Sequence, residues 1–326
     1  LVKSIGRLHS RIPKNAQLPP SLDADYGYWF YPHILNQLAR LFVGIKTIRN
    51  DYHRDFFLVC FSALLKKVSL ADPRLSVPVR QRADHYPERH PLRIHAEKRL
   101  RRLKRINVIS EFWQIVNINK IRIEQLKNIN EGIKLIDIEH DARMIGKKSK
   151  MNITVDMIIT SPPYNGAQKY TRASKLSLSW LAEVENITIS SVEEKCIGRE
   201  HFKKIDYQIL PRTGVLKADE FLIETIKVNP LRAYIAATYL LEMKEALLQA
   251  TLLLKRGGYF VLVAGNNYVC GREFMTVDYL TETIENLGFV CVGRLIDEIK
   301  SRGLMTKRNK TASLITREWV CIFQKK

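Results

Sequence analysis

The sequence predicts an α/β protein in which an open sheet follows a helical, strongly basic segment. From residue 131 onward, short apolar runs that are typical of buried strands alternate with longer segments of helical periodicity. Between residues 28 and 130, apolar residues recur at helical spacing instead. We therefore divide the chain into an arm or linker (residues 1–27), a helical basic segment (28–130) and an α/β portion (131–326).

The composition bounds the class of protein. The 326 residues, 46% of them hydrophobic, suffice for one large domain or two modest ones. No apolar run is long enough to cross a bilayer and no secretory leader opens the chain, so we expect a cytoplasmic protein with no membrane partner. The five cysteines are odd in number and lack paired spacing, which predicts neither a disulfide framework nor a metal site.

The charge of the chain indicates its kind of partner. A net charge of +20 and a pI of about 9.8 point to a polyanion, most simply nucleic acid. Part of this charge gathers between Arg74 and Arg105, where few acids interrupt the basic residues. Such a run is either a solvated helix face or a set of phosphate contacts, and the sequence leaves both open.

Three helices are predicted in the basic segment. The spacing of their apolar residues places them at residues 33–48, 51–68 and 108–130, and the first two are expected to pack as a pair. Residues 71–80 have no regular period and are predicted to form a loop. The first 27 residues hold several prolines and few apolar residues, which favours an arm or linker.

The α/β portion begins with a predicted strand at Ile133–Ile138. A polar segment at residues 183–225 is expected to be an irregular insertion. The remaining predicted elements are a strand buried on both faces at Val155–Thr160, a helix at 231–254, a strand at Tyr259–Ala264, a helix at Val277–Leu287, and two final strands at Phe289–Ile299 and Glu318–Phe323.

The strand at Val155–Thr160 ends in Ser161-Pro162-Pro163-Tyr164, here called the SPPY segment. Each proline fixes its own φ and lacks an N–H, and Pro163 also holds Pro162 in the extended region. The result is a stiff segment at the carboxyl end of a strand, where open α/β sheets place their ligands. A Pro-Pro turn that only closes a core strand is the alternative.

The SPPY segment carries groups that can activate an exocyclic amine of a nucleobase. Such an amine is a poor nucleophile because its lone pair is delocalised into the ring. The Ser161 hydroxyl and the Pro162 carbonyl can accept hydrogen bonds from its two hydrogens and stabilise positive charge as it develops. Tyr164 offers a flat face for a base taken out of its stack. An amine held in this way can attack an activated methyl group in line.

On these residues the chain resembles the amino-group DNA methyltransferases, whose signature is Asp, Ser or Asn, then Pro-Pro, then an aromatic residue. Further matches lie in the run Ser161–Leu181, at Gly265-Asn266-Asn267 and in the run Ser301–Lys310. The resemblance covers roughly residues 133–326 and, more loosely, residues 28–80. It implies a class I methyltransferase sheet, which is Rossmann-like and has an antiparallel last strand. It also implies S-adenosyl-L-methionine as the cofactor, DNA as the partner, and methylation of cytosine N4 or adenine N6 after base flipping, as in restriction-modification systems. No cysteine follows a proline, so the Pro-Cys nucleophile of cytosine-C5 methyltransferases is absent.

The resemblance also implies roles for residues outside the SPPY segment. Asp141 matches an acidic residue that contacts the adenine of the cofactor, with Ala142 beside it; a helix N-cap is the alternative for Asp141. Asn266 and Lys175 are expected on the substrate side of the pocket.

The long loop before the last predicted strand is basic. Between Lys300 and Lys310 it contains no acid, and Lys307, Arg308 and Lys310 are expected to contact DNA phosphates near the flipped nucleotide. A solvated surface loop is the alternative.

One expected feature of the family is missing. Its members hold the methionine end of S-adenosyl-L-methionine with a glycine-rich loop after their first strand, and this chain contains no such loop. Read as this fold, the chain holds the third strand onward. Either it is the C-terminal part of a longer protein, or an upstream-encoded half or subunit supplies the loop, or cofactor binding has been lost.

Three function classes therefore stay open. The first is a DNA amino-methyltransferase, complete or in part. The second is a methyltransferase that acts on RNA or on a protein glutamine, against which Ser161 argues mildly because those enzymes more often carry Asn there. The third is a non-catalytic DNA-binding subunit of a modification system, which the missing glycine-rich loop supports.

Overall fold

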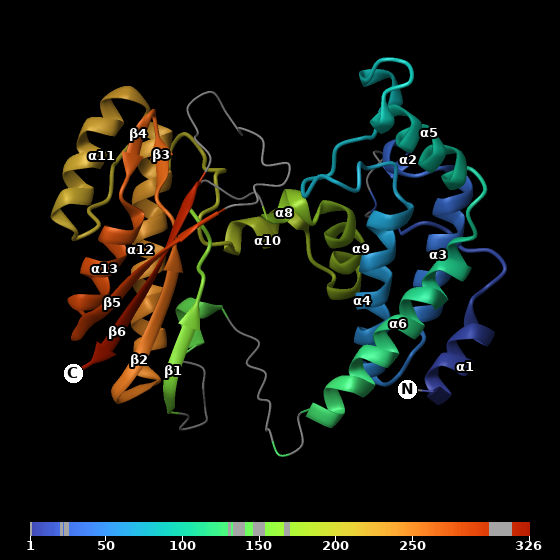
Figure 1. The fold of residues 1–326 in the computed structure, drawn as a ribbon, viewed down its shortest axis with the longest axis horizontal. Coiled ribbons are helices and arrows are strands. Elements are labelled where there is room, and N and C mark those ends of the chain that lie inside the picture. Colours follow the sequence, from blue (N-terminus) through green and yellow to red (C-terminus); the bar gives the residue numbers. More distant parts are fainter. Residues whose placement is uncertain are drawn as a thin grey trace. The chain divides into compact units, whose positions relative to one another are not determined.

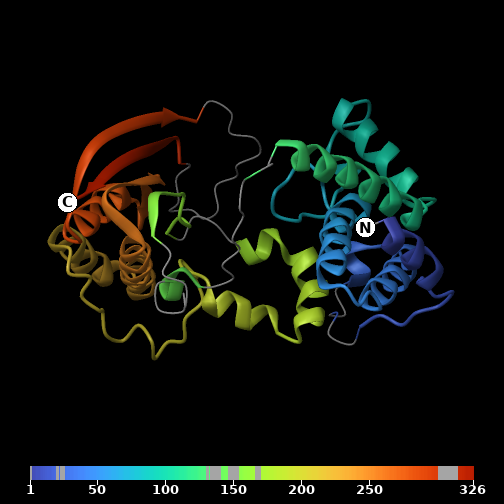
Figure 2. The ribbon, with the colours of Figure 1, turned by 90° about the horizontal axis from the view of Figure 1, so that it is seen from below.

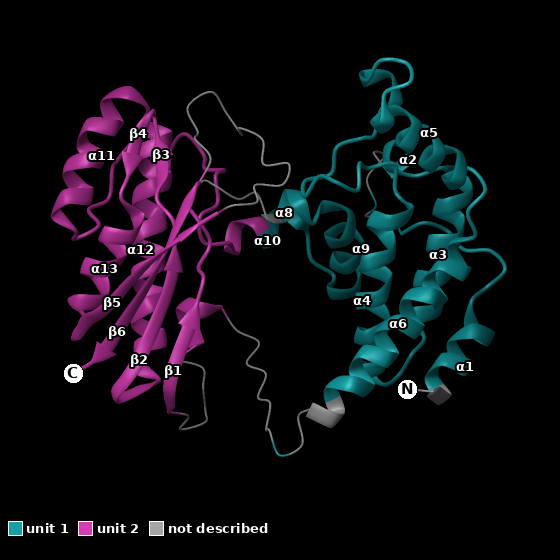
Figure 3. Cartoon of the chain, viewed as in Figure 1, with its two compact units in different colours: residues 1–134, 170–192 teal, residues 135–169, 193–326 magenta. Residues whose placement is uncertain are grey.

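The computed structural model of the chain describes residues 2–19, 22, 26–129, 132, 141–145, 154–165, 170–299 and 315–326. The chain forms two compact units, and each unit combines two stretches that are separate in the sequence (Figure 1, Figure 3). Unit 1 comprises residues 1–134 and 170–192. Unit 2 comprises residues 135–169 and 193–326.

Unit 1 is built of helices. They are α1 (Val2–Arg11), α2 (Tyr26–Trp29), α3 (Pro32–Lys46), α4 (Asp51–Val68), η1 (Ala83–His85), α5 (Pro91–Leu103), α6 (Val108–Ile129), α8 (Tyr170–Ala173), α9 (Lys175–Glu185) and α10 (Ile189–Lys195), the last of which leads into unit 2. The three helices that the sequence predicts correspond to α3, α4 and α6. Local sequence explains their starts: α3 begins with proline, and the Asn50 side chain caps α4 by accepting from the His53 N–H at 3.0 Å.

Trp180 of α9 lies at the centre of the unit 1 core. Its ring is fully buried and contacts the rings of Phe42 and Phe61, with centroids 5.1 and 5.2 Å apart. The Tyr26 hydroxyl donates to the carbonyl oxygen of Leu176, one turn before Trp180, at 3.1 Å. Residues 170–192, which the sequence places in the α/β portion, thus pack with the helices because their large apolar side chains complete this aromatic core.

The N-terminal residues also differ from the sequence expectation. Instead of an arm, residues Val2–Arg11 form α1, whose Leu8 is fully buried in the unit 1 core. Two side-chain contacts hold the region: Arg11 donates to the Thr47 carbonyl at 2.7 Å, and Arg40 donates to the Pro13 carbonyl at 2.6 Å. The prolines end α1 but do not prevent it.

Unit 2 contains a mixed sheet, as the predicted α/β class requires. Its elements are η2 (Ala142–Met144), β1 (Val155–Thr160), α11 (Leu216–Val228), α12 (Pro230–Leu252), β2 (Leu254–Ala264), the hairpin β3 (Asn267–Val269) and β4 (Arg272–Phe274), α13 (Thr276–Glu285), β5 (Phe289–Glu298) and β6 (Arg317–Lys325). The strand order is β1-β2-β6-β5, with β1 parallel to β2 and β6 antiparallel to both of its neighbours. The predicted strand at Ile133–Ile138 lies outside the described residues.

Helices of unit 2 cover one face of this sheet (Figure 2). On that face Phe260 and Leu262 of β2 are fully buried. On the opposite face Met157 and Ile159 of β1 are 52% and 69% exposed. β1 has the predicted bounds, but the prediction that it is buried on both faces is wrong, because among the described residues helices cover one side only and β1 lies at the edge of the sheet.

Candidate active site

The SPPY segment leaves the sheet at the carboxyl end of β1. β1 pairs with β2 up to Thr160, which lies opposite Leu262, and the next residue, Ser161, is exposed. The Ser161 hydroxyl makes no hydrogen bond with any described residue. Pro162 is buried and cannot donate, so the ladder stops there. An exposed serine and a buried proline therefore follow directly at the strand end.

Tyr164 is held through its hydroxyl and its ring. It is 9% exposed, and its hydroxyl donates to the Glu318 carboxylate at the start of β6. Its ring lies against Gly265, where an added Cβ would be 3.6 Å from the ring and only 2.8 Å from Ile315. A larger residue than glycine at position 265 would have to displace one of these neighbours.

Asn165 and Asn267 connect the SPPY segment to the hairpin β3–β4. The Asn267 amide donates to the Asn165 carbonyl at 2.5 Å, and its own carbonyl oxygen accepts from the Thr276 hydroxyl at 3.2 Å. Asn165 is 2% exposed, and its side-chain nitrogen is buried without a partner among the described residues. Leaving such a donor unpaired is costly, so Asn165 is a candidate contact for a ligand at this site.

Asn266, predicted to bind substrate, is occupied within the chain. Its side-chain oxygen accepts from the Val277 N–H at 3.1 Å, near the start of α13, and its nitrogen donates to Glu273 at 3.2 Å. Both contacts join the strand end to α13 and to β4. In this structure Asn266 therefore supports the backbone beside the SPPY segment.

Asp141, predicted to contact the cofactor, caps η2. Its carboxylate accepts from the Arg143 N–H at 3.0 Å and pairs with the Arg143 guanidinium at 2.6 Å. The contact with Asp141 is the main cause of the raised pKa of Arg143. The N-cap alternative thus describes what Asp141 does here, and Ala142 is the first residue of the short helix that it caps.

A cluster of charges, here called the Glu242 cluster, connects η2 to the SPPY segment. Arg143 and Arg199 both contact the Glu242 carboxylate of α12, at 3.2 and 2.8 Å. Burial raises the pKa of Glu242, and the two guanidinium groups oppose that shift. Next to Arg199, Gly198 has φ +80° and lies so close to the Tyr164 carbonyl that an added Cβ would be 3.3 Å from it.

The structure brings some of the predicted residues together and leaves others apart. The SPPY segment, Asn266 and the Asp141–Ala142 pair all belong to unit 2. Lys175 begins α9 in unit 1, so its substrate role stays a prediction. Lys307, Arg308 and Lys310 lie outside the described residues.

Sequence reasoning missed Glu318 and Asn165. Asn165 directly follows the SPPY segment, so its position was a usable signal. Nothing in the sequence singled out Glu318, because its role depends on β6 pairing with β2, which places Trp319 opposite Ala264.

The described side chains include no group of three or more His, Cys, Asp or Glu that could hold a metal ion. No helix in the described part of the chain is long and apolar enough to span a membrane.

Comparison with known proteins gives a distant match. No protein-family model and no curated protein matches the chain. Two solved structures match, both of a "Putative DNA Modification Methylase" from Thermus thermophilus, one of them complexed with S-adenosyl-L-methionine. They are 17% and 16% identical to this chain, with TM-scores of 0.28 and 0.26, and the match covers 57% of it. The chain spans about half the length of these structures, 52% and 53%.

Proposed function

We propose that this chain is the catalytic portion of a DNA methyltransferase that methylates an exocyclic amine, cytosine N4 or adenine N6. The observation that carries the proposal is the SPPY segment at the carboxyl end of β1, with an exposed Ser161 and a buried Tyr164 whose hydroxyl is bonded to Glu318. The antiparallel β6 is further support, because the resemblance to amino-methyltransferases predicts an antiparallel last strand.

In the proposed reaction, residues of this chain prepare the amine. The Ser161 hydroxyl and the Pro162 carbonyl accept hydrogen bonds from the amino group of a flipped base. These acceptors stabilise the positive charge that develops on the nitrogen as it attacks. Tyr164 forms a wall for the flipped base, and Glu318 fixes the orientation of that wall.

The methyl donor in this proposal is S-adenosyl-L-methionine, which supplies an electrophilic methyl group when bound. Among the described residues, Asp141 and Ala142 are the candidates for its adenine side. Both oxygens of Asp141 already accept from Arg143, at 3.0 and 2.6 Å, and the sequence contains no glycine-rich loop for the methionine side. The described residues therefore do not form a complete cofactor site.

A further polypeptide segment is proposed to complete that site. The support comes from the sheet of unit 2, where β1 lies at the edge and exposes Met157 and Ile159 on the face opposite the helices. Edge strands and exposed apolar faces are places where further strands and helices add to a sheet. Such a segment, upstream-encoded or from another subunit, would bring the glycine-rich loop.

A methyl-transfer assay tests the proposed function. The chain, alone and together with any upstream-encoded polypeptide, is incubated with radiolabelled S-adenosyl-L-methionine and with DNA, RNA or protein. We expect label in DNA, on cytosine N4 or adenine N6, and only when the glycine-rich loop is supplied. Label in RNA or in glutamine side chains, with none in DNA, would contradict the proposal.

A second candidate, a non-catalytic DNA-binding subunit, is favoured by one observation. The amide of Asn266 and the carboxylate of Asp141 are both paired within the chain, which leaves two predicted ligand contacts occupied. If the chain is such a subunit, it should bind DNA but transfer no methyl group in the assay above, whether alone or with an upstream-encoded polypeptide.

A further inference from the structure

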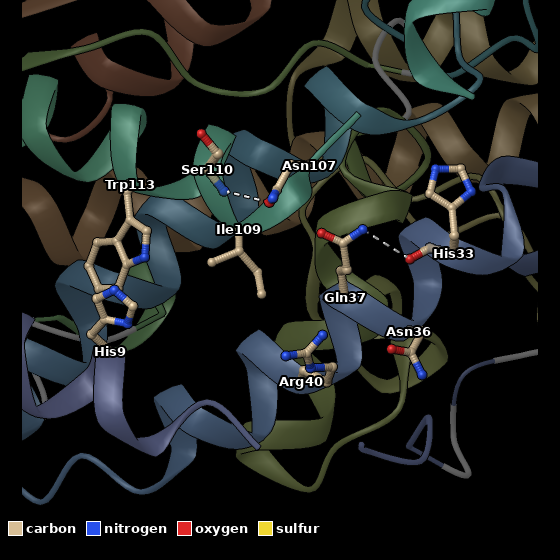
Figure 4. Close-up of a pocket in the computed structure, with 9 residues that line it drawn as sticks. All are labelled: His9, His33, Asn36, Gln37, Arg40, Asn107, Ile109, Ser110 and Trp113. Carbon is tan, nitrogen blue, oxygen red and sulfur yellow. Dashed lines mark hydrogen bonds between the residues drawn. The ribbon is translucent and has the colours of Figure 1, made fainter. Parts of the chain in front are cut away.

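Unit 1 contains an open pocket of about 830 Å³ that the proposed reaction does not use (Figure 4). It lies between α1, α3 and the start of α6, all of which belong to unit 1. Its volume is within the range of about 300–1,000 Å³ that is usual for small-molecule sites.

One wall of the pocket is aromatic. The rings of His9 and Trp113 lie against each other, with centroids 5.7 Å apart and planes 35° apart. Beside them Ile109 points into the pocket from α6 (Figure 4). An imidazole, an indole and an aliphatic side chain together form a surface on which a flat ring can stack.

The opposite wall is polar and comes from one face of α3. His33, Asn36, Gln37 and Arg40 follow one another at helical spacing and all line the pocket. The Gln37 side-chain oxygen accepts from the Val108 N–H at 2.9 Å, which fixes the start of α6 against α3. The exposed Asn36 amide makes no hydrogen bond with a described residue, so it can bind a ligand.

Two ring nitrogens of this pocket have no partner. Nε2 of His33 and Nε1 of Trp113 are buried and make no hydrogen bond in the described part of the chain. Both nitrogens are closed to solvent, so they supply no contact to a ligand in the open pocket. Arg40 donates through Nε to the Pro13 carbonyl, which orients its guanidinium at the edge of the pocket.

The charge of the residues that line the pocket further restricts the class of ligand. The described residues that line the pocket include a guanidinium and no carboxylate, and unit 1 as a whole carries 27 Lys and Arg against 13 Asp and Glu. The site therefore suits a ligand that joins a flat, hydrogen-bonding ring to an anionic group.

We propose that this pocket binds one unpaired nucleotide. The base stacks on His9 and Trp113, Asn36 pairs with the edge of the base, and Arg40 contacts the phosphate. Asparagine side chains suit base edges and arginine suits phosphate, because of the geometry of their donors and acceptors. The proposal rests on the proposed function in one respect, since a DNA substrate is the expected source of the nucleotide.

Binding of a fluorescein-labelled single-stranded oligonucleotide to the full chain, followed by anisotropy without S-adenosyl-L-methionine, tests the pocket. We expect His9→Ala and Asn36→Ala, both exposed residues, to weaken binding together by about tenfold, since removal of one base–aromatic stack and one base contact has effects of this order. Trp113→Phe keeps a ring and should weaken binding less. The matched controls are His95→Ala and Asn117→Ala, which are exposed on α5 and α6 and do not line the pocket.

Two further arms identify the source of the nucleotide. An oligonucleotide with abasic sites keeps its phosphates, so it should bind weakly and should lose nothing in the pocket variants. A free deoxynucleoside monophosphate that competes at the same concentration would show that the pocket takes free nucleotides instead of a strand. Unchanged affinity in the pocket variants, or equal competition by inorganic phosphate, would overturn the proposal. Because no methyl transfer is measured, a failure here is distinct from a failure of the proposed function.

Discussion

The two units of this chain bury their apolar residues in different ways. In unit 1 the core surrounds Trp180, which is fully buried among rings contributed by α3, α4 and α2. In unit 2 the sheet is covered on one face, whereas Met157 and Ile159 on the other face are exposed. The units also differ in charge, since unit 1 carries +14 of the formal +20.

On the basis of this difference, we propose different tasks for the two units. Unit 1 has an enclosed core, most of the positive charge and a polar pocket, which suit a nucleic-acid-binding module. In the described part of unit 2, the SPPY segment lies on a sheet in which β1 forms an edge and one face is exposed. We propose that unit 2 needs a complement before it can act.

The largest expected effect is in the core of unit 1. Trp180→Ala removes the ring that Phe42 and Phe61 pack against, and losses of this kind cost about 3–5 kcal/mol. Urea unfolding followed by circular dichroism measures the change. Tyr52→Ala, at a residue that is 87% exposed, is the control and should change stability little. If the two variants lowered the free energy of unfolding equally, the packing around Trp180 would not stabilise unit 1.

The next comparison is between the two faces of the unit 2 sheet. Leu262→Ala on the covered face should cost about 2–5 kcal/mol because it leaves a cavity. Ile159→Ala on the neighbouring strand should cost about 0.5 kcal/mol or less in the chain alone, since that side chain is exposed. If an added polypeptide covers β1, the cost of Ile159→Ala should rise in its presence. If Ile159→Ala lowered the free energy of unfolding of the chain alone by much more than this, the exposed face of the sheet would already be covered.

A pH dependence is expected from Tyr26 in unit 1. Burial raises the pKa of Tyr26 to about 12 from its ordinary value of 10.0. Because the folded state favours the neutral phenol, the stabilisation is complete below pH 10.0 and is lost as pH rises toward about 12. The loss is on the order of 2–3 kcal/mol.

The test of this pH dependence compares Tyr26→Phe with Tyr52→Phe. The Phe variant at position 26 should give the shallower fall in unfolding free energy between pH 10.0 and 12. At neutral pH it should be less stable by about 1 kcal/mol, because the bond to the Leu176 carbonyl is gone. Parallel pH curves for the two variants would contradict the account.

The smallest effect expected is on the salt dependence of DNA binding. Arg101, Lys104 and Arg105 are exposed at the end of α5 in unit 1, whereas Arg99 is used inside the unit, donating to the Ser69 carbonyl at 2.7 Å. Replacing the three exposed residues by alanine should lower the slope of log affinity against log salt by about 0.9 for each phosphate that they neutralise.

The control for this measurement changes three exposed cations of unit 2, Lys203, Lys217 and Arg256. Replacing these three residues by alanine should leave the slope of log affinity against log salt unchanged if unit 1 carries the phosphate contacts. The opposite pattern would assign DNA binding to unit 2. The same slope measured for alanine at Lys307, Arg308 and Lys310 tests the basic loop, which stays a prediction.

Much of the fold could be predicted, because local patterns determine it. The apolar spacing of α3, α4 and α6 and the apolar run of β1 are properties of neighbouring residues. The placement of residues 170–192 could not be predicted in this way, since Trp180 finds its partners on helices more than a hundred residues away in sequence. The exposure of β1 also depends on what covers the sheet.

The residues of the candidate site also fall into those that local sequence predicts and those that only the fold brings together. The SPPY segment could be predicted because its prolines restrict the local backbone, and Asn165 follows it directly. Glu318 was not visible, because it reaches Tyr164 only through the pairing of β6 with β2. The paired state of Asn266 could not be predicted either, since Val277 and Glu273 become its partners only through folding. The capping role of Asp141, in contrast, is local and was one of the two alternatives that the sequence offered.

The most direct test of the central claim is methyl transfer by Ser161→Ala in a preparation shown to methylate DNA. Removal of one electrostatic contact to the reacting amine typically slows the reaction by about 10² to 10³. We therefore expect the rate of N4-methylcytosine or N6-methyladenine formation, measured by mass spectrometry, to fall by that factor while DNA affinity stays the same. Ser76→Ala, at an exposed serine of unit 1, should leave the rate unchanged. An unchanged rate in Ser161→Ala would show that the SPPY segment does not hold the reacting amine.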